Sequence, residues 1–336
     1  MKAFRITKPG SFQQTDVSAA VCGEEDVVIS VKYVGLCGSD LHSYLGSSPM
    51  VKYPIIPGHE ISGVVSETGK KVLGFKAGDV VTVLPYFNCG TCYPCSEGRP
   101  NCCEFNQTLG VQRDGVLSES FTVHQSHVIK SPLSLELTAL VEPFSIGWHA
   151  AARAGVKKGD FTAVFGCGAV GIGVMLAAHA MGAHVIACDV SAEKLDFIKS
   201  FAGFDTIELS GNAKSAALGL TGGTGITSAI DATGSPKALP TLLEMINFAG
   251  RAGIVGYANG YTEMESRLIV SKELSLNGSR NANAQDFEHV IEMIDKAEFD
   301  YSRLISAVLP LDEASGVFDY WSRERDSIVK ILIKMI

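Results

Sequence analysis

The sequence predicts a two-domain α/β protein in which a β-rich domain is followed by a domain built on a doubly wound parallel sheet. The length of 336 residues exceeds what one hydrophobic core usually fills, and at roughly 100–200 residues per domain it indicates two domains. Residues 1–140 show short alternating apolar runs between turns, without a helical period longer than about two turns. From about Leu137 onward, apolar strands alternate with helices, which is typical of a parallel sheet covered on both faces.

The first domain is predicted from its strands and turns. Residues 27–31 (VVISV) and 80–83 (VVTV) are rich in β-branched residues, and turns with Gly, Pro or Asp separate such runs. We expect this domain to occupy residues 1–140 and to be completed by residues 285–336. A helix at 283–296 leads into this last segment, and a closing strand at 328–333 ends it.

The second domain, residues 141–284, is predicted from the alternation of strands and helices. The expected strands are residues 162–165, 184–188, 228–230 and 253–255, and the expected helices are 169–181, 191–201 and 236–248. Residues 161–188 contain no Asp, Glu, Lys or Arg, but five glycines interrupt them. We interpret this stretch as a buried strand, helix and strand rather than a membrane span.

Composition excludes several classes of protein. Hydrophobic residues make up 46% and charged residues 19%, which is inconsistent with a mainly disordered chain. The net charge of −8 disfavours nucleic acid as a partner. Nine cysteines in a long chain without an apolar leader predict reduced thiols in the cytoplasm, available as metal ligands, rather than a disulfide scaffold.

A cluster of cysteines predicts a closed metal site. Cys89, Cys92, Cys95 and Cys103 lie in the segment CGTCYPCSEGRPNCC, where four thiolates can wrap one ion. Zinc favours such a tetrahedral thiolate shell, and a shell closed in this way has no position for a substrate, so we expect a structural role. Spacing alone leaves open whether Cys103 or its neighbour Cys102 is the fourth ligand.

A second group of residues predicts an open metal site. Cys37 in GLCGSDLH and His59 and Glu60 in PGHEISGVV are bracketed by glycine turns and together offer a mixed ligand set. Three mixed ligands and one free position characterise catalytic zinc, although a lone Cys or His is more often a packed core residue than a ligand. Glu142 in VEPFSIGWHA is a further carboxylate, and the alternative for it is a helix-start residue beside Pro143.

A glycine-rich turn predicts a dinucleotide site. The sequence Gly166-Cys167-Gly168-Ala169-Val170-Gly171 follows an expected strand and opens an expected helix. Its glycines let backbone N–H groups approach a pyrophosphate, and Asp189 ends the next strand where an acid binds the ribose hydroxyls. The carboxylate would repel a 2′-phosphate and so favours NAD over NADP, a preference that Lys194 nearby softens.

Together these motifs make the chain resemble the zinc-dependent medium-chain dehydrogenase/reductase family. The segment GHEISGVVSETGKKV fits the family's zinc signature, and the cysteine loop and GCGAVG follow in the expected order, so the resemblance covers essentially the whole chain. GLCGSDLH, GRPNCC, VEPF and GSRNA point to its polyol, threonine and sugar-acid branch. One departure is Val80, where the family often has Arg.

The resemblance implies a fold, two zinc ions and a proton relay. In this family the first domain is GroES-like, the second is a Rossmann domain, and the active site lies in the cleft between them. It implies that Cys37, His59 and Glu60 hold a catalytic zinc, with Glu142 ligating the ion or binding its water. Ser39 and His42 match the positions that carry the alcohol proton away, although a turn residue and a surface imidazole are the alternatives.

The sequence therefore predicts NAD-dependent oxidation of a secondary alcohol in a polyol or a sugar acid, with zinc as Lewis acid. Arg280 in GSRNA is a candidate to neutralise a substrate carboxylate, and a structural ion pair or cofactor contact is its alternative. An amino alcohol such as threonine is a second substrate candidate, and a non-enzymatic nucleotide sensor is a third hypothesis. The resemblance also implies a homodimer or homotetramer.

Overall fold

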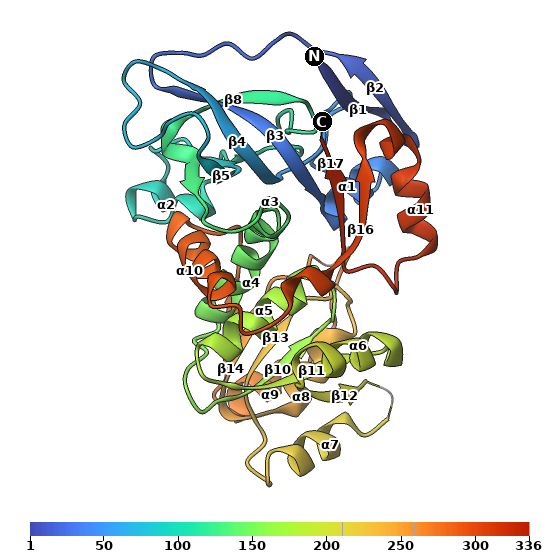
Figure 1. Ribbon diagram of the computed structural model, residues 1–336. Coiled ribbons are helices and arrows are strands. Elements are labelled where there is room, and N and C mark those ends of the chain that lie inside the picture. Colours follow the sequence, from blue (N-terminus) through green and yellow to red (C-terminus); the bar gives the residue numbers. More distant parts are fainter. Residues whose placement is uncertain (210, 258–259, 336) are drawn as a thin grey trace. The chain divides into compact units, whose positions relative to one another are not determined.

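The computed structural model describes residues 1–209, 211–257 and 260–335, and the chain forms two compact units (Figure 1). Unit 1 comprises Met1–Glu142, Asn283–Ala297 and Tyr301–Ile336. Unit 2 comprises Pro143–Ala282 and Glu298–Asp300. The end of the chain therefore returns to the unit in which the chain begins.

Unit 1 is built on a seven-stranded sheet of the order β16-β17-β3-β4-β5-β9, in which β8 also pairs with β3. The strands are β3 (Asp26–Leu36), β4 (Glu60–Thr68), β5 (Val80–Val83), β8 (Ser120–His124), β9 (Val128–Lys130), β16 (Ile305–Pro310) and β17 (Lys330–Lys334). The long strand β3 lies inside this sheet, and its consecutive apolar residues, such as Val27, Val28 and Ile29, are buried on both faces. β17 pairs antiparallel with β3 and thereby joins the last residues to this sheet.

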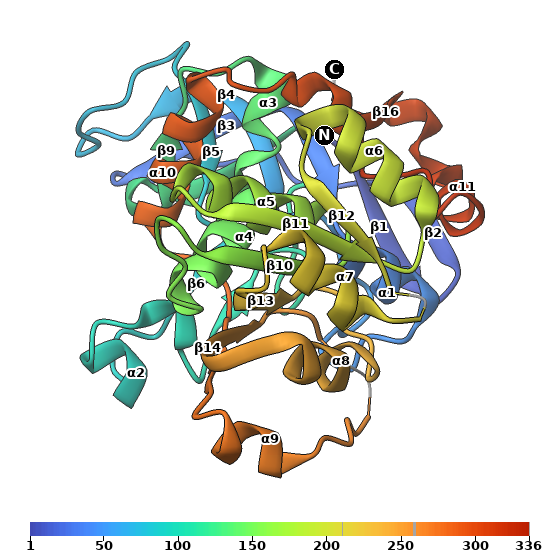
Figure 2. The same ribbon diagram turned by 90° about the horizontal axis from the view of Figure 1, so that it is seen from below.

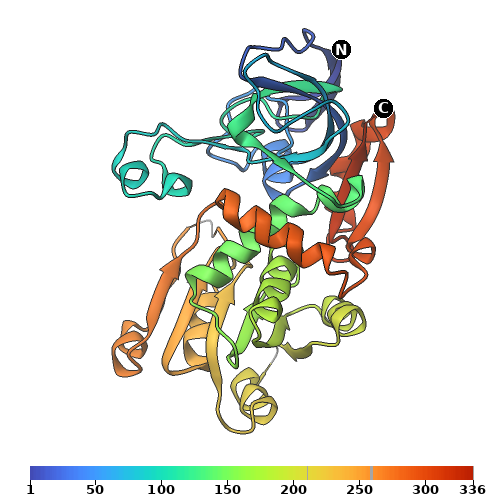
Figure 3. The same cartoon turned by 60° about the vertical axis from the view of Figure 1, so that its left-hand side comes forward.

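Smaller elements surround this sheet. A hairpin of β1 (Lys2–Lys8) and β2 (Ser11–Asp16) and a ladder of β6 (Tyr86–Phe87) and β7 (Gln107–Thr108) complete the strands. The helices are α1 (Gly38–Leu45), α2 (Tyr93–Ser96), α3 (Leu135–Thr138), α10 (Ala284–Asp295) and α11 (Val317–Arg323), with 3-10 turns η1 (Pro100–Cys102), η2 (Gln125–His127), η3 (Tyr301–Leu304) and η4 (Leu311–Gly316). The loop that carries α2 projects from the strands of unit 1 as a lobe of its own (Figure 3).

Unit 2 is a doubly wound domain. Six described strands run parallel in the order β12-β11-β10-β13-β14-β15. The parallel, doubly wound sheet is the one that the sequence predicts, although β12 and β15 are additional to the four predicted strands, and Figure 2 shows β10 to β14. The strands are β10 (Phe161–Phe165), β11 (His184–Asp189), β12 (Asp205–Glu208), β13 (Ile226–Asp231), β14 (Ile246–Ile254) and β15 (Ser275–Gly278). The order reverses between β10 and β13, and ligands bind at such a switch point in folds of this class.

Helices cover both faces of the parallel sheet. They are α4 (Val141–Arg153), α5 (Ala169–Ala180), α6 (Ala192–Ala202), α7 (Ala213–Leu220), α8 (Ala238–Met245) and α9 (Ser266–Ser271). Residues of α7, α8 and α9 pack on the face that presents Ala163, Phe165 and Ile186. The apolar stretch 161–188 forms β10, α5 and β11, and no helix within the described residues is long and apolar enough to span a bilayer.

The predicted helix 236–248 and the predicted strand 253–255 are corrected here, because β14 spans Ile246–Ile254. The expected helix 236–248 ends at Met245, and Ile246 already begins β14. The reason is tertiary: the buried ammonium of Lys272 donates hydrogen bonds to the carbonyl oxygens of Leu243, Glu244 and Ile246 at 2.7, 3.1 and 2.8 Å, which caps the helix end. The structure also contains the helix α4, for which the sequence indicated only a possible helix start near Pro143.

Candidate functional site

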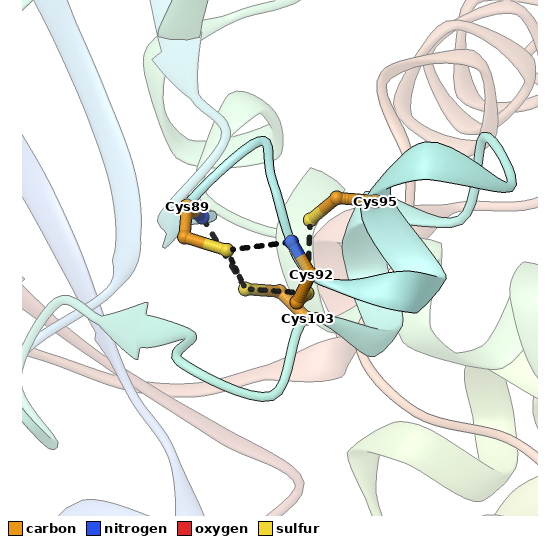
Figure 4. A group of neighbouring side chains, drawn as sticks. All are labelled: Cys89, Cys92, Cys95 and Cys103. Carbon is orange, nitrogen blue, oxygen red and sulfur yellow. Dashed lines mark hydrogen bonds between the residues drawn. The ribbon is translucent and has the colours of Figure 1, made fainter.

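Four cysteines of the projecting loop converge on one point (Figure 4). The sulfur atoms of Cys89, Cys92, Cys95 and Cys103 all lie within 4.8 Å of one another. Three sulfur–sulfur separations are 3.5 Å (Cys92 to Cys95), 3.8 Å (Cys92 to Cys103) and 3.6 Å (Cys103 to Cys89). A tetrahedron with metal–sulfur bonds of about 2.3 Å has edges of about 3.8 Å, so this arrangement fits a zinc ion.

The loop backbone favours the thiolate form of Cys89, whereas burial raises the pKa of Cys95 to about 12. The N–H groups of Cys92 and Cys89 donate to the sulfur atoms of Cys89 and Cys103, each at 3.3 Å. Backbone donors at Thr91 and Cys92 lower the pKa of Cys89 to about 6, which favours the thiolate form that binds metal. Cys102 stays outside the group, and its sulfur accepts a hydrogen bond from Arg99 at 3.6 Å.

The second predicted group also comes together. Ligand atoms of Cys37, His59 and Glu60 lie within 4.8 Å of one another, and His59 and Glu60 are buried. Cys37 is the N-cap of α1, and His59 stands immediately before β4. Two loops that are 22 positions apart in sequence thus supply a thiolate, an imidazole and a carboxylate to one place.

Asp40 ties these two loops to each other. Its carboxylate is fully buried and accepts hydrogen bonds from the backbone N–H of Cys37 at 2.9 Å and of Gly58 at 3.1 Å. Gly58 has φ +99°, a conformation that favours glycine. The Asp40 side chain therefore fixes the backbone of Cys37 and of Gly58, the residue before His59.

Glu60 is held from the other side by a buried lysine. The Lys330 ammonium, 3% exposed, donates to both oxygens of Glu60 at 2.6 Å and to the carbonyl oxygen of Leu36 at 3.1 Å. The carboxylate fits because Gly35 has no side chain: a Cβ there would lie 2.2 Å from Glu60 Oε2. The pairing of β17 with β3 brings Lys330 to this position.

The electrostatics of the site favour a cation. Burial by itself lowers the pKa of His59, but the hydrogen bond to Cys37 and the charges of Cys37, Asp40 and Glu142 raise it well above its usual value. A buried imidazole whose pKa is raised stands in a strongly negative environment. A divalent metal would neutralise that charge, and the buried Nδ1 of His59, which has no hydrogen-bond partner among the described residues, is free of competing contacts.

Glu142 lies nearby but does not join the three-residue ligand group. It lies in the first turn of α4 and accepts a hydrogen bond from the buried hydroxyl of Tyr86. Burial raises the pKa of Glu142.

The predicted relay residues lie on α1. Ser39 Oγ is buried and has no hydrogen-bond partner within the part of the chain that the structure describes. His42, one turn later, is exposed, and its Nδ1 lies 2.8 Å from Ser47 Oγ. Because Ser39 and His42 are three positions apart on α1, they lie on the same face of that helix.

The glycine loop of unit 2 forms the turn between β10 and α5. Gly166 has φ +98°, and a Cβ at Gly171 would lie 1.8 Å from the Gly166 oxygen, so both positions require glycine. A Cβ at Gly168 would meet nothing within 4 Å, which leaves open space at the N-terminus of α5. Val170 stands in the first turn of this helix. The backbone can therefore approach a pyrophosphate at this helix end.

Asp189 ends β11 next to this loop, as expected. Its carboxylate accepts from the backbone N–H of Cys167 at 2.7 Å and of Ser191 at 3.0 Å. Lys194 lies in the first turn of α6, where its N–H donates to Ser191 Oγ at 3.4 Å. The acid is thus fixed at the carboxyl end of the strand, where a ribose would bind.

Three residues of the site were not found by sequence reasoning. Asp40 shows a local signal, since an acid three positions after an N-cap is typical of a capping box. Lys330 shows a weaker one, because it is a charge inside an apolar closing strand (SIVKILIKMI). Tyr86 shows none, because its partner is 56 positions away.

The chain is similar to known proteins over most of its length. Residues 23–133 match the model of the alcohol dehydrogenase GroES-like domain, and residues 169–296 match that of the zinc-binding dehydrogenases. An uncharacterized zinc-type alcohol dehydrogenase-like protein of Haemophilus influenzae is 33% identical over 98% of both chains. L-galactonate-5-dehydrogenase of Escherichia coli is 32% identical over 88% of both. A solved structure of a short chain alcohol dehydrogenase from Escherichia coli CFT073 with NADH has a TM-score of 0.90 and 29% identity, covering 99% of each chain.

Proposed function

The chain belongs to the zinc-type alcohol dehydrogenase family, and from this premise we propose that it transfers a hydride from a secondary alcohol of a polyol or sugar acid to NAD. Membership makes it a zinc-containing oxidoreductase of the polyol and sugar branch. The observation that carries the proposal is the convergence of Cys37, His59 and Glu60 into a mixed ligand set beside a separate four-thiolate set.

The two metal sites would have different roles. Cys89, Cys92, Cys95 and Cys103 would hold a zinc ion that stabilises the loop. Cys37, His59 and Glu60 would hold the second, whose chemical contribution is that of a Lewis acid that makes an alcohol more acidic.

The remaining site residues would move and position the proton. Ser39 Oγ would accept a hydrogen bond from the alcohol, and the proton would leave through this hydroxyl and the cofactor ribose to the exposed imidazole of His42 and to water. Lys330 would hold the Glu60 carboxylate in place, since its ammonium donates a hydrogen bond to each of the two oxygens.

The glycine loop and Asp189 would bind the cofactor, which supplies the hydride acceptor. Gly166, Gly168 and Gly171 would admit the pyrophosphate to the N-terminus of α5. Asp189 favours NAD because a 2′-phosphate would meet its negative charge, and the relative crystallised with NADH supports this choice.

For the substrate, we place a sugar acid such as L-galactonate ahead of an uncharged polyol. Arg280, exposed just after β15, offers a guanidinium that can bind a carboxylate, and the identity to L-galactonate-5-dehydrogenase supports this class. An amino alcohol such as threonine is the second candidate. We also propose a homodimer or homotetramer, which light scattering would test.

The experiment is a substrate panel on protein with measured zinc content. L-galactonate, galactitol, xylitol and L-threonine are supplied with NAD or NADP, and reduced cofactor is followed by absorbance. Turnover of an aldonate or polyol with NAD is expected, together with two zinc ions per chain, of which Cys37→Ser loses one along with activity. A lack of turnover with every polyol and sugar acid contradicts the proposal, and turnover of threonine alone supports the second candidate. One zinc ion per chain, unaffected by Cys37→Ser, would favour the non-enzymatic sensor.

The variant Arg280→Gln tests whether Arg280 binds the carboxylate of a sugar-acid substrate. It should raise KM for L-galactonate and leave KM for galactitol unchanged, because only the former carries the charge. A rise in KM for NAD with both substrates would instead identify Arg280 as a cofactor contact.

A further inference from the structure

Two glutamates stand at the open metal site, and different donors hold them. Glu60 is bound through both oxygens by the charged Lys330 and belongs to the ligand group with Cys37 and His59. Glu142 is bound by the neutral hydroxyl of Tyr86 and does not belong to that group. The ligand set at this site therefore depends on what restrains each carboxylate.

Tyr86 is well placed to act as a restraint because its own position is fixed. It is 4% exposed, and it pairs with Thr108 in the ladder of β6 and β7. The next residue, Phe87, packs against two groups: the Arg113 guanidinium lies 3.9 Å from the ring centroid, and the His127 ring stacks on it at 4.1 Å. These contacts anchor β6, so the Tyr86 hydroxyl has little freedom to follow Glu142.

The hydrogen bond from Tyr86 uses only one of the two carboxylate oxygens of Glu142. Tyr86 donates to Oε1, and the structure gives Oε2 no hydrogen bond from any described residue. A carboxylate has about four lone-pair sites, so Glu142 keeps accepting capacity beside the open site while one of its oxygens is held back. Without this hydrogen bond, Glu142 would turn toward a divalent cation in the open site. A carboxylate oxygen is a metal ligand, and a buried negative charge is stabilised by a positive charge next to it.

We propose that Tyr86 is a positioning residue that keeps Glu142 out of the metal's ligand shell, so that Cys37, His59 and Glu60 form that shell and Glu142 remains a hydrogen-bond acceptor next to it. The inference rests on the proposed function only in requiring a divalent metal at this site. The Tyr86 hydroxyl donates its hydrogen bond to Glu142 and not to Cys37, His59 or Glu60. Its effect on the metal ligands would therefore act through Glu142.

The test is ¹¹³Cd NMR of protein whose zinc has been replaced by ¹¹³Cd. Thiolate ligands move the ¹¹³Cd resonance downfield and oxygen ligands move it upfield, so the four-thiolate and one-thiolate sites give well-separated signals. In Tyr86→Phe the one-thiolate signal should move upfield as Glu142 enters the shell, and a chelator should remove this metal several-fold more slowly. The four-thiolate signal should not move, which provides an internal control.

Tyr33→Phe is the matched control variant. Tyr33 is 7% exposed, lies in the same unit and donates to a glutamate, Glu136, at 2.6 Å, but that glutamate is not part of either metal group. This variant should leave both signals in place. Glu142→Gln should also leave the one-thiolate signal where it is, and it should cancel the shift when combined with Tyr86→Phe.

The proposal is overturned if Tyr86→Phe folds normally by circular dichroism and its one-thiolate signal stays in place. It is also overturned if Glu142→Gln alone moves that signal downfield, since Glu142 would then already be a ligand. The Glu142→Gln measurement tests the proposal even if Tyr86→Phe does not fold, because it shows directly whether Glu142 is a metal ligand. Neither measurement depends on turnover, so a failure of the substrate panel and a failure of this inference are separate results.

Discussion

Replacing Lys330 with methionine should destabilise unit 1 strongly. The change removes the donor of two 2.6 Å hydrogen bonds to Glu60 and of one 3.1 Å bond to Leu36, while Glu60 itself is 0% exposed. Removing one partner of a buried ion pair typically costs about 3–5 kcal/mol, because the other charge is left without compensation. With a urea m-value of about 2.5 kcal/mol per M, the midpoint of unfolding should fall by about 1–2 M.

The two tryptophans allow the decrease in the free energy of unfolding to be measured for unit 1 alone. Trp321 packs against the core of unit 1, and Trp148 lies in unit 2, so a Trp148→Phe background reports unit 1 through Trp321 fluorescence. Urea unfolding of metal-free protein with and without Lys330→Met gives the difference in free energy of unfolding.

Two further variants make the result interpretable. Lys2→Met breaks a surface ion pair with Asp312 that spans 3.4 Å, with side chains 40% and 70% exposed, and it should cost no more than about 1 kcal/mol. The double variant Glu60→Leu with Lys330→Met should recover most of the loss, because a well-packed apolar pair replaces a broken ionic one. A loss below about 1 kcal/mol in Lys330→Met would refute the reasoning, because the buried carboxylate would then not depend on the lysine.

Three other predictions concern the remaining features. Cys103→Ser should lose one zinc ion per chain by metal analysis whereas Cys102→Ser keeps both, and the opposite pattern would contradict the assignment of the fourth thiolate. Thr82→Val should raise the free energy of unfolding by up to about 1 kcal/mol, because Thr82 Oγ1, like Ser62 Oγ on the neighbouring strand, is buried without a partner in the described residues; a decrease would reveal a partner. Burial lowers the pKa of His127 below 6.5, so the unfolded chain binds the proton more readily and stability should fall as the pH drops below that value. His127→Asn should flatten this fall in thermal melts taken between about pH 7 and pH 5, and an unchanged slope would exclude His127 as its source.

The sequence by itself determined those features that depend on residues close together in the chain. The spacing of Cys89, Cys92 and Cys95 lets one short loop place three sulfur atoms around an ion, and Gly166 to Gly171 form one turn between a strand and a helix. The alternation of strands and helices likewise determined the doubly wound sheet, because chain chirality and short connections leave few other arrangements.

The tertiary structure decided what depends on contacts between distant segments. It brought Cys103 rather than Cys102 into the thiolate group, ended α8 at Met245 through Lys272, and joined Lys330 to Glu60 across 270 positions of sequence. It also gave Glu142 the partner Tyr86. No local pattern records such pairings, because they arise only when strands and helices pack and most buried polar groups take a partner, wherever in the chain that partner lies.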